Sequence, residues 1–199
     1  MPDPDAASPD DRLPLIVICD YDADDPVWDP VEDLSGSHWR PPGARVLSLG
    51  GEDPERLFDS LSGCLRDGRC RALVLVGRTS DPDAFRIQMR AENRDLGGTG
   101  RLSDALPSLA RTTLPVAGVV EALNDAGLSA KATSEAEPDA GSYLLFRALS
   151  ELPDTVEAPA IGLLRIPREA SEEAGRKAIK ATAAVVAAQL SPISRLQHA

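Results

Sequence analysis

Few side chains in this chain could serve as a nucleophile or as the base that activates one. There are three cysteines, Cys19, Cys64 and Cys70, and two histidines, His38 and His198. The cysteines are odd in number and their spacing does not fit a metal site, so we expect free thiols in a reducing compartment, the cytoplasm. A cysteine–histidine pair could be assembled only from Cys19 and His38, and nothing else in the sequence supports that pairing.

A cluster of carboxylates offers a second kind of chemistry. Asp20, Asp22, Asp24 and Asp25 follow the apolar run LIVIC, and carboxylate oxygens are ligands that Mg²⁺ and Ca²⁺ prefer. The cluster lacks the spacing and the glycine of an EF-hand loop. We therefore interpret it as an acidic surface loop and predict no metal and no cofactor. A hydrolase with a metal-dependent site in residues 20–25 is the alternative hypothesis.

The longest run of polar side chains follows the apolar segment Ala72 to Gly77 (ALVLVG). An uninterrupted apolar run of this length predicts a strand that is buried on both faces of a sheet. Ligands of such sheets usually bind at the loops that leave the carboxyl ends of the strands. We therefore expect a functional loop from Arg78 to about Gly100, whose polar residues are Arg78, Asp81, Asp83, Arg86, Gln88, Arg90, Glu92, Asn93, Arg94 and Asp95.

Apolar runs and helical patterns alternate along the chain and must position these residues. We expect strands at 15–19, 45–49, 72–77, 129–133 and 160–166, and helices at 54–67, 114–125, 141–152 and 171–190. This alternation predicts an α/β fold, a three-layer α/β/α sandwich with a mostly parallel central sheet. One domain is expected over residues 13–190, between a disordered tail at 1–12 and a second tail at 191–199.

The remaining segments carry weaker patterns. Residues 20–42 predict a long loop with a short helix at 29–34, residues 102–111 an irregular region, and residues 134–140 an acidic turn. Thr112, Thr113 and Pro115 are expected to start one helix, which Gly127 would stop. Ser142 could be a nucleophile, but a serine at the start of a helix is more typical of a cap.

Composition excludes several classes of partner. The formal net charge is −11, from 32 acidic and 21 basic residues in 199. A chain this acidic is not expected to bind nucleic acid, whose affinity comes mainly from neutralising phosphates, or to dock on anionic lipid. No apolar segment is long enough to span a membrane, and the first residues lack the basic-then-apolar pattern of a signal peptide.

Several short motifs, in order, resemble pyroglutamyl peptidase I, the pyrrolidone-carboxylate peptidases of cysteine peptidase family C15. The strand that ends at Gly77 and the stretch Ile87 to Asn93 (IQMRAEN) resemble one element of that family. Thr113 to Pro115 resembles its Thr-Leu-Pro, and Thr133 to Leu149 the segment around its catalytic cysteine. Gly162 to Pro167 (GLLRIP) resembles the segment of its catalytic histidine. The resemblance covers about residues 15–190 and implies a pyrrolidone-carboxylate-peptidase-like fold.

The same resemblance implies that the catalytic groups have been replaced. The positions of the family's glutamate, cysteine and histidine fall on Gln88, Gly141 and Arg165. Glycine has no side chain that could attack a carbonyl, and arginine stays protonated and cannot act as a base. The resemblance therefore predicts a catalytically inactive homologue, a pseudoenzyme, with no catalytic residue left at the degenerate triad positions.

The resemblance implies that Arg165 lies at a strand end near the start of the helix that contains Gly141, where it has two interpretations. With Gln88, Asn93 and Ser142 it could form a ligand-binding site for a small anion, because guanidinium groups and helix N-termini both bind anions. It could instead pair internally with Glu135, Glu137 or Asp139. We expect a binding role at the former active site, for a small anion or a protein partner. Members of the family often self-associate, which makes a homo-oligomer a state to test.

Overall fold

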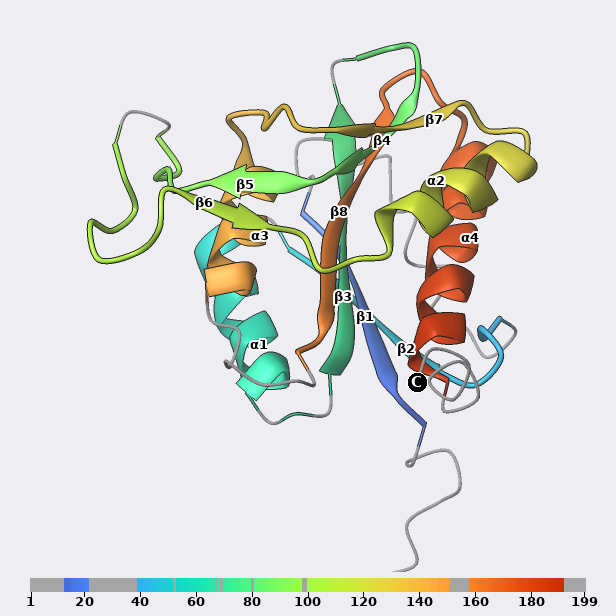
Figure 1. Cartoon of the computed structure of the whole chain (residues 1–199), viewed down its shortest axis with the longest axis horizontal. Coiled ribbons are helices and arrows are strands. Elements are labelled where there is room, and N and C mark those ends of the chain that lie inside the picture. Colours follow the sequence, from blue (N-terminus) through green and yellow to red (C-terminus); the bar gives the residue numbers. More distant parts are fainter. Residues whose placement is uncertain are drawn as a thin grey trace, which may run out of the picture.

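The computed structural model describes residues 13–21, 39–51, 53–66, 68, 70–79, 81–97, 100–150 and 158–191 (Figure 1). The tail expected at 1–12, all but the first residue of the tail at 191–199, and the helix expected at 29–34 lie outside these residues. Every strand and helix of the described part lies between Leu15 and Leu190.

A six-stranded sheet forms the centre of the fold. Its strands stand in the order β2 (Arg45–Gly50), β1 (Leu15–Asp20), β3 (Cys70–Thr79), β8 (Ala160–Pro167), β4 (Phe85–Gln88) and β7 (Ala130–Thr133). All neighbouring strands are parallel except β4 and β8, which are antiparallel. The predicted α/β class and the mostly parallel sheet are therefore confirmed. The apolar run from Ala72 lies in the middle of the sheet, as its lack of polar residues required.

In the described part of the chain, helices α1 to α4 cover the two faces of the sheet (Figure 1). Helices α1 (Pro54–Arg66) and α3 (Ala140–Ser150) pack on one face, and α2 (Val116–Asp125) and α4 (Glu172–Leu190) on the other. Successive side chains of β1 point to opposite faces of the sheet and so contribute to both hydrophobic cores. Ile16 and Ile18 pack under α2 and α4, whereas Val17 and Cys19 pack under α1 and α3. No helix of the described part is both long and apolar enough to cross a membrane.

Local capping explains where two of the helices begin. The Asp53 carboxylate accepts a hydrogen bond from the backbone N–H of Glu55 at 3.0 Å, and Pro54 occupies the first helical position of α1. At α4, the Ser171 hydroxyl accepts from the N–H of Ala174 at 3.2 Å. Helix α2 stops before Gly127, which takes the left-handed backbone conformation with φ of 78°.

The expected loop at 78–100 is wrong in its first half. Strand β3 continues to Thr79, β4 follows at Phe85–Gln88, and β5 (Arg90–Glu92) pairs with β6 (Leu109–Arg111) in a separate two-stranded sheet. The region expected to be irregular at 102–111 thus contains a strand. The polar residues of β4 hid it, since Arg86 and Gln88 look like loop residues but are both buried by pairing with other polar groups.

Thr112 and Thr113 do not start α2, which corrects a further expectation. The N-cap position is Pro115, without a side-chain cap. The Thr112 hydroxyl donates to the carbonyl of Ile161 at 2.5 Å, and the Thr113 hydroxyl donates to the carbonyl of Pro159 at 2.7 Å. The two hydroxyls therefore bind backbone carbonyls at the beginning of β8 and hold the segment before α2 against that strand.

Candidate functional site

The guanidinium group of Arg165 is the centre of a buried polar cluster. Arg165 lies on β8 and is 0% exposed, and it is the largest of the fully buried side chains. Its Nη1 and Nη2 donate to the two carboxylate oxygens of Asp139 at 2.6 and 2.9 Å. Nε donates to Oε1 of Gln88 at 2.8 Å, Nη1 to the Tyr21 hydroxyl at 3.2 Å and Nη2 to the Ser142 hydroxyl at 2.9 Å. Each nitrogen of the group therefore has a partner.

The charge of Arg165 is secured by its surroundings. Burial by itself lowers the pKa of this guanidinium, but the hydrogen bond to Asp139 and the nearby Tyr21, Asp139 and Glu137 raise it, and the net shift is upward. A carboxylate oxygen of Glu137 lies 3.7 Å from Nε. Arg165 is therefore a fixed positive charge and cannot exchange a proton with a substrate.

Tyr21 fills the space beside Gly141. A Cβ built on Gly141 would overlap the Cζ and hydroxyl oxygen of the Tyr21 ring, and a Cβ on Gly77 would overlap the same atoms. Tyr21 is 6% exposed. The ring thus occupies the volume into which any side chain at position 141 would have to project. Both glycines are needed because the tyrosine lies between β3 and the start of α3.

The structure brings together most of the predicted site residues. Gln88 and Ser142 both contact Arg165, and Gln88 Nε2 also donates to the Ser142 hydroxyl at 3.1 Å. Gly141 joins this group through Tyr21, which bonds Arg165. The convergence of positions 88, 141 and 165 matches the expectation from the sequence.

Asn93 was expected to bind a ligand beside Arg165, but its side chain binds backbone carbonyls of a loop. Its amide nitrogen donates to the carbonyls of Ser103 at 2.7 Å, Pro107 at 3.2 Å and Leu106 at 3.3 Å. Asn93 is 4% exposed, and these hydrogen bonds hold the loop between β5 and β6 together from its buried side. Within the described part of the chain it shares no hydrogen bond with Arg165.

Ser142 is not the helix cap that the sequence suggested. The cap of α3 is Asp139, whose Oδ1 accepts from the backbone N–H of Ser142 at 2.9 Å. Asp139 therefore serves both the helix N-terminus and Arg165. Three acids were proposed as internal partners of Arg165. Asp139 forms a bidentate pair with its guanidinium, and a carboxylate oxygen of Glu137 lies 3.7 Å from its Nε. Glu135 pairs instead with Arg86 at 2.8 Å.

A second polar cluster surrounds Arg86 on the neighbouring strand, at the position that pairs with Arg165. Arg86 Nη2 donates to the Thr133 hydroxyl at 2.9 Å, and Nη1 lies 3.4 Å from Asp81. Asp81 also pairs with Lys131 at 3.0 Å. A backbone hydrogen bond from Asp83, followed by the contacts with Lys131 and Arg86, lowers the pKa of Asp81 below its ordinary value.

Among the described residues, neither the cysteines nor Ser142 has a base beside it. The thiol of Cys19 is buried, and burial followed by the charge of Asp20 raises its pKa, so it stays protonated. Cys70 is also buried, Cys64 is half-buried, and no disulfide joins the three. Both histidines lie outside the described residues. The Ser142 hydroxyl contacts Gln88 and Arg165, neither of which can accept its proton.

No metal site is formed by the part of the chain that the structure describes. That part holds no group of three or more histidine, cysteine, aspartate or glutamate residues that could bind a metal ion. Asp20 is the last residue of β1, while Asp22, Asp24 and Asp25 lie outside the described residues. The hypothesis of a metal-dependent site at 20–25 therefore stays a prediction.

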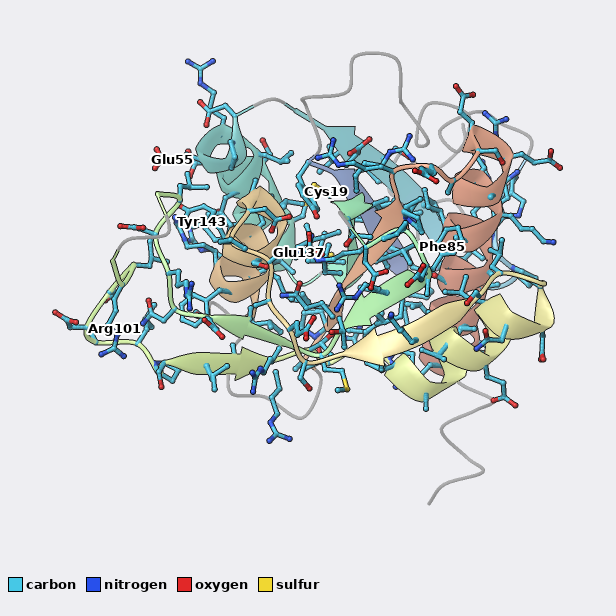
Figure 2. The ribbon with its side chains drawn as sticks, turned by 90° about the horizontal axis from the view of Figure 1, so that it is seen from above. Cys19, Glu55, Phe85, Arg101, Glu137 and Tyr143 are labelled. Atoms are coloured by element: carbon cyan, nitrogen blue, oxygen red, sulfur yellow. The ribbon has the colours of Figure 1, made fainter. Side chains whose placement is uncertain are left out.

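A small cavity of about 20 Å³ adjoins the Arg165 cluster, with Glu92, Arg94, Glu137, Asp139 and Ser142 among its lining residues. Figure 2 shows this region from above, with Glu137 and Tyr143 labelled near the start of α3. A cavity of this size has room for about one water molecule. The cluster is therefore closed in this conformation, and a ligand would need part of its wall to move.

Tyr21 is the site residue that sequence reasoning missed. Its signal was indirect, because the two glycines that leave room for the ring lie far from it in the chain. A single tyrosine in a segment rich in aspartate also looked like part of the expected acidic loop.

Comparison with known proteins gives a fold but no sequence family. No family model matches the chain, and no curated protein matches it. Among solved structures, pyroglutamyl peptidase I from Bacillus amyloliquefaciens superposes with a TM-score of 0.75 at 17% identity, over 90% of this chain and 97% of that one. A variant of pyrrolidone carboxyl peptidase from Pyrococcus furiosus superposes with a TM-score of 0.74 at 16% identity, over 89% of this chain and 100% of that one. Pyrrolidone carboxyl peptidase from Thermus thermophilus superposes with a TM-score of 0.69 at 18% identity, over 85% of this chain and 98% of that one.

Proposed function

We propose that this protein has the fold of the pyroglutamyl peptidases without their hydrolytic chemistry, and that it acts by binding. The observation that carries the proposal is the Arg165 cluster. The family resemblance assigns the glutamate, cysteine and histidine to positions 88, 141 and 165, and those positions meet at one place in the fold. They hold an amide, a glycine beside a tyrosine ring, and a permanently charged guanidinium.

The chemistry of this cluster supports binding over catalysis. Loss of a nucleophile or its base lowers the rate of comparable hydrolases by about 10⁴–10⁶. A buried guanidinium with an amide and two hydroxyls around it, by contrast, is well suited to hold a negative charge. We propose that the former active site binds a small anion or a protein partner. We also propose a cytoplasmic location, because an odd number of cysteines without metal-site spacing is typical of free thiols in a reducing compartment.

A hydrolysis assay tests this proposal. The full chain is incubated with a pyroglutamyl-aminomethylcoumarin substrate, with a pyroglutamyl peptidase of the same fold as positive control. We expect no release of coumarin above the blank. A saturable rate that survives repurification, and that Gly141→Ala or Arg165→Gln alters, would overturn the proposal.

The relocated hydrolase is the second candidate, and one observation favours it. Asp20 ends a central strand of the sheet, the place where ligands of such folds often bind. If residues 20–25 hold a catalytic metal, Mg²⁺ or Mn²⁺ should raise both the melting temperature and the activity toward a panel of ester and amide substrates. Asp20→Asn and Asp22→Asn should abolish both effects, and an unchanged melting temperature would remove this candidate.

A further inference from the structure

The surroundings of Arg165 are those of a carboxylate site whose occupant belongs to the chain itself. Asp139 binds both terminal nitrogens of the guanidinium, at 2.6 and 2.9 Å, which is the bidentate geometry of a bound carboxylate ligand. The Ser142 hydroxyl, the Tyr21 hydroxyl and the Gln88 amide complete the shell around the guanidinium. If Asp139 were absent, an external carboxylate could accept hydrogen bonds from the groups that Asp139 now uses, the two terminal nitrogens of Arg165 and the backbone N–H of Ser142.

Asp139 ends a segment that lies over the cluster and is held mainly by its side chains. We call Ser134–Asp139 the acidic strap, which joins β7 to α3 without regular structure. Among the described residues its backbone–backbone hydrogen bonds are local, from Asp139 N–H to Glu137 and from Tyr143 N–H to Asp139. The strap is joined to the sheets by contacts from Arg90 to the Ser134 carbonyl, from Thr79 to Glu137, from Arg86 to Glu135 and Glu137, and from Arg165 to Glu137 and Asp139.

We propose that the Arg165 cluster is a binding site for a carboxylate, that Asp139 closes it from within, and that the acidic strap must move away before an external carboxylate can enter. This inference rests on the proposed binding function and names its ligand class and its regulation. Because each of these contacts among the described residues involves a side chain, the strap can leave without breaking a sheet ladder. The helix α3 begins only at Ala140, so the rest of the core can stay in place.

The internal carboxylate must outcompete small anions in solution. Asp139 is held at the start of the helix that forms one wall of the site, and a group positioned in this way has an effective concentration far above that of a ligand at millimolar concentration. The intact protein should therefore bind acetate weakly or not at all. Removal of the Asp139 side chain should expose a guanidinium that lacks its bidentate partner.

Acetate rescue tests the proposal. Melting temperatures of the intact protein and of Asp139→Ala are measured against sodium acetate, with sodium chloride at equal ionic strength as reference and sodium phosphate as a tetrahedral anion. Asp104→Ala makes the same chemical change at a side chain that is 95% exposed. Asp139→Asn keeps the volume of the side chain and provides a second variant if the alanine variant does not fold. Asp139→Ala/Arg165→Met removes the proposed receptor group.

The expected result is a saturable rise in melting temperature with acetate for Asp139→Ala, at an affinity at least about 100-fold above that of the intact protein. Chloride should not reproduce it, and the double variant should lose it. The proposal is overturned if acetate acts no better than chloride on both Asp139 variants, if it acts equally on Asp104→Ala, or if only phosphate acts. Coumarin release by the intact protein would overturn the proposed function but would leave the acetate result standing.

Discussion

A methyl group at Gly141 is predicted to destabilise the protein because it competes with Tyr21 for the same space. The built Cβ overlaps the ring, with even the more distant Cε1 only 2.7 Å away. Since the ring lies between two backbone segments, it must leave its position, which costs about 1–3 kcal/mol in repacking. It also gives up its hydrogen bond to Arg165, worth about 1.5–3 kcal/mol because one partner is charged.

The helical position returns part of this cost. Replacing glycine by alanine in a helix gains about 0.5–1 kcal/mol, so Gly141→Ala should lower the free energy of unfolding by about 1.5–5.5 kcal/mol in total. The matched control is Gly63→Ala on α1, where a Cβ has no heavy atom within 4 Å. That variant should be stabilised by about 0.5–1 kcal/mol.

A double-mutant cycle separates this cause from a general defect at the start of α3. Urea unfolding gives the free energy of unfolding for Gly141→Ala, Tyr21→Ala and the double variant. With the ring removed, the added methyl should cost nothing or stabilise slightly, so the coupling should be at least about 1.5 kcal/mol. An equal cost of Gly141→Ala in both backgrounds would refute the packing argument. The same argument predicts that Gly141→Cys alone creates no accessible nucleophile.

The remaining predictions concern acid stability, thiol reactivity and the loop closed by Asn93. The folded pKa of Asp81 lies below its ordinary value of 3.8, so its contribution to stability is complete above that pH and is lost as the pH falls. Asp81→Asn should therefore flatten the loss of stability between about pH 5 and pH 3 in urea titrations, and an unchanged slope would contradict the lowered pKa that the Asp83 hydrogen bond and the Lys131 contact produce. At pH 8 a thiol reagent should label Cys64 and spare the buried Cys19, as peptide mapping would show; rapid labelling of Cys19 would contradict its raised pKa. Asn93→Ala should cost about 1–3 kcal/mol and speed amide exchange at residues 103–108, and a change confined elsewhere would show that Asn93 does not hold that loop.

Continuous apolar runs made the sheet predictable from the sequence. The segments around Ile16, Leu73 and Leu163 contain few or no polar residues, which is typical of strands covered by helices on both sides. The pattern failed at β4, where Arg86 and Gln88 are buried. A polar residue can be buried only with partners, and those partners come from distant parts of the chain, so local composition carries no sign of them.

The members of the candidate site were predictable only in part, because Gln88, Ser142 and Arg165 lie together whereas Asn93 lies elsewhere and Tyr21 was missed. The resemblance to a known family brought together positions 88, 141 and 165, and the structure shows them in one place. The sequence left open whether Arg165 would bind an outside anion or an inside one. That choice depends on the path of residues 134–139, which placed Asp139 against the guanidinium and Glu135 against Arg86. A run of alternating acids does not indicate which of them points inward.

The filling of the space beside Gly141 depended even more on tertiary structure. Tyr21 follows a buried strand in a segment with few apolar residues, and nothing nearby in the sequence requires its burial. Gly77 and Gly141 made the room, and glycines at the end of a strand and the start of a helix have several ordinary explanations. The physical reason for both becomes visible only when the ring is seen between them.

The central claim is that positions 88, 141 and 165 meet without any group able to attack a pyroglutamyl bond. A single-turnover experiment tests it most directly, with the protein in excess over a fluorogenic pyroglutamyl amide so that even one slow cleavage per molecule is counted. The account predicts a progress curve that coincides with the buffer blank over many hours. A stoichiometric burst of product that disappears in the Arg165→Gln variant would contradict it.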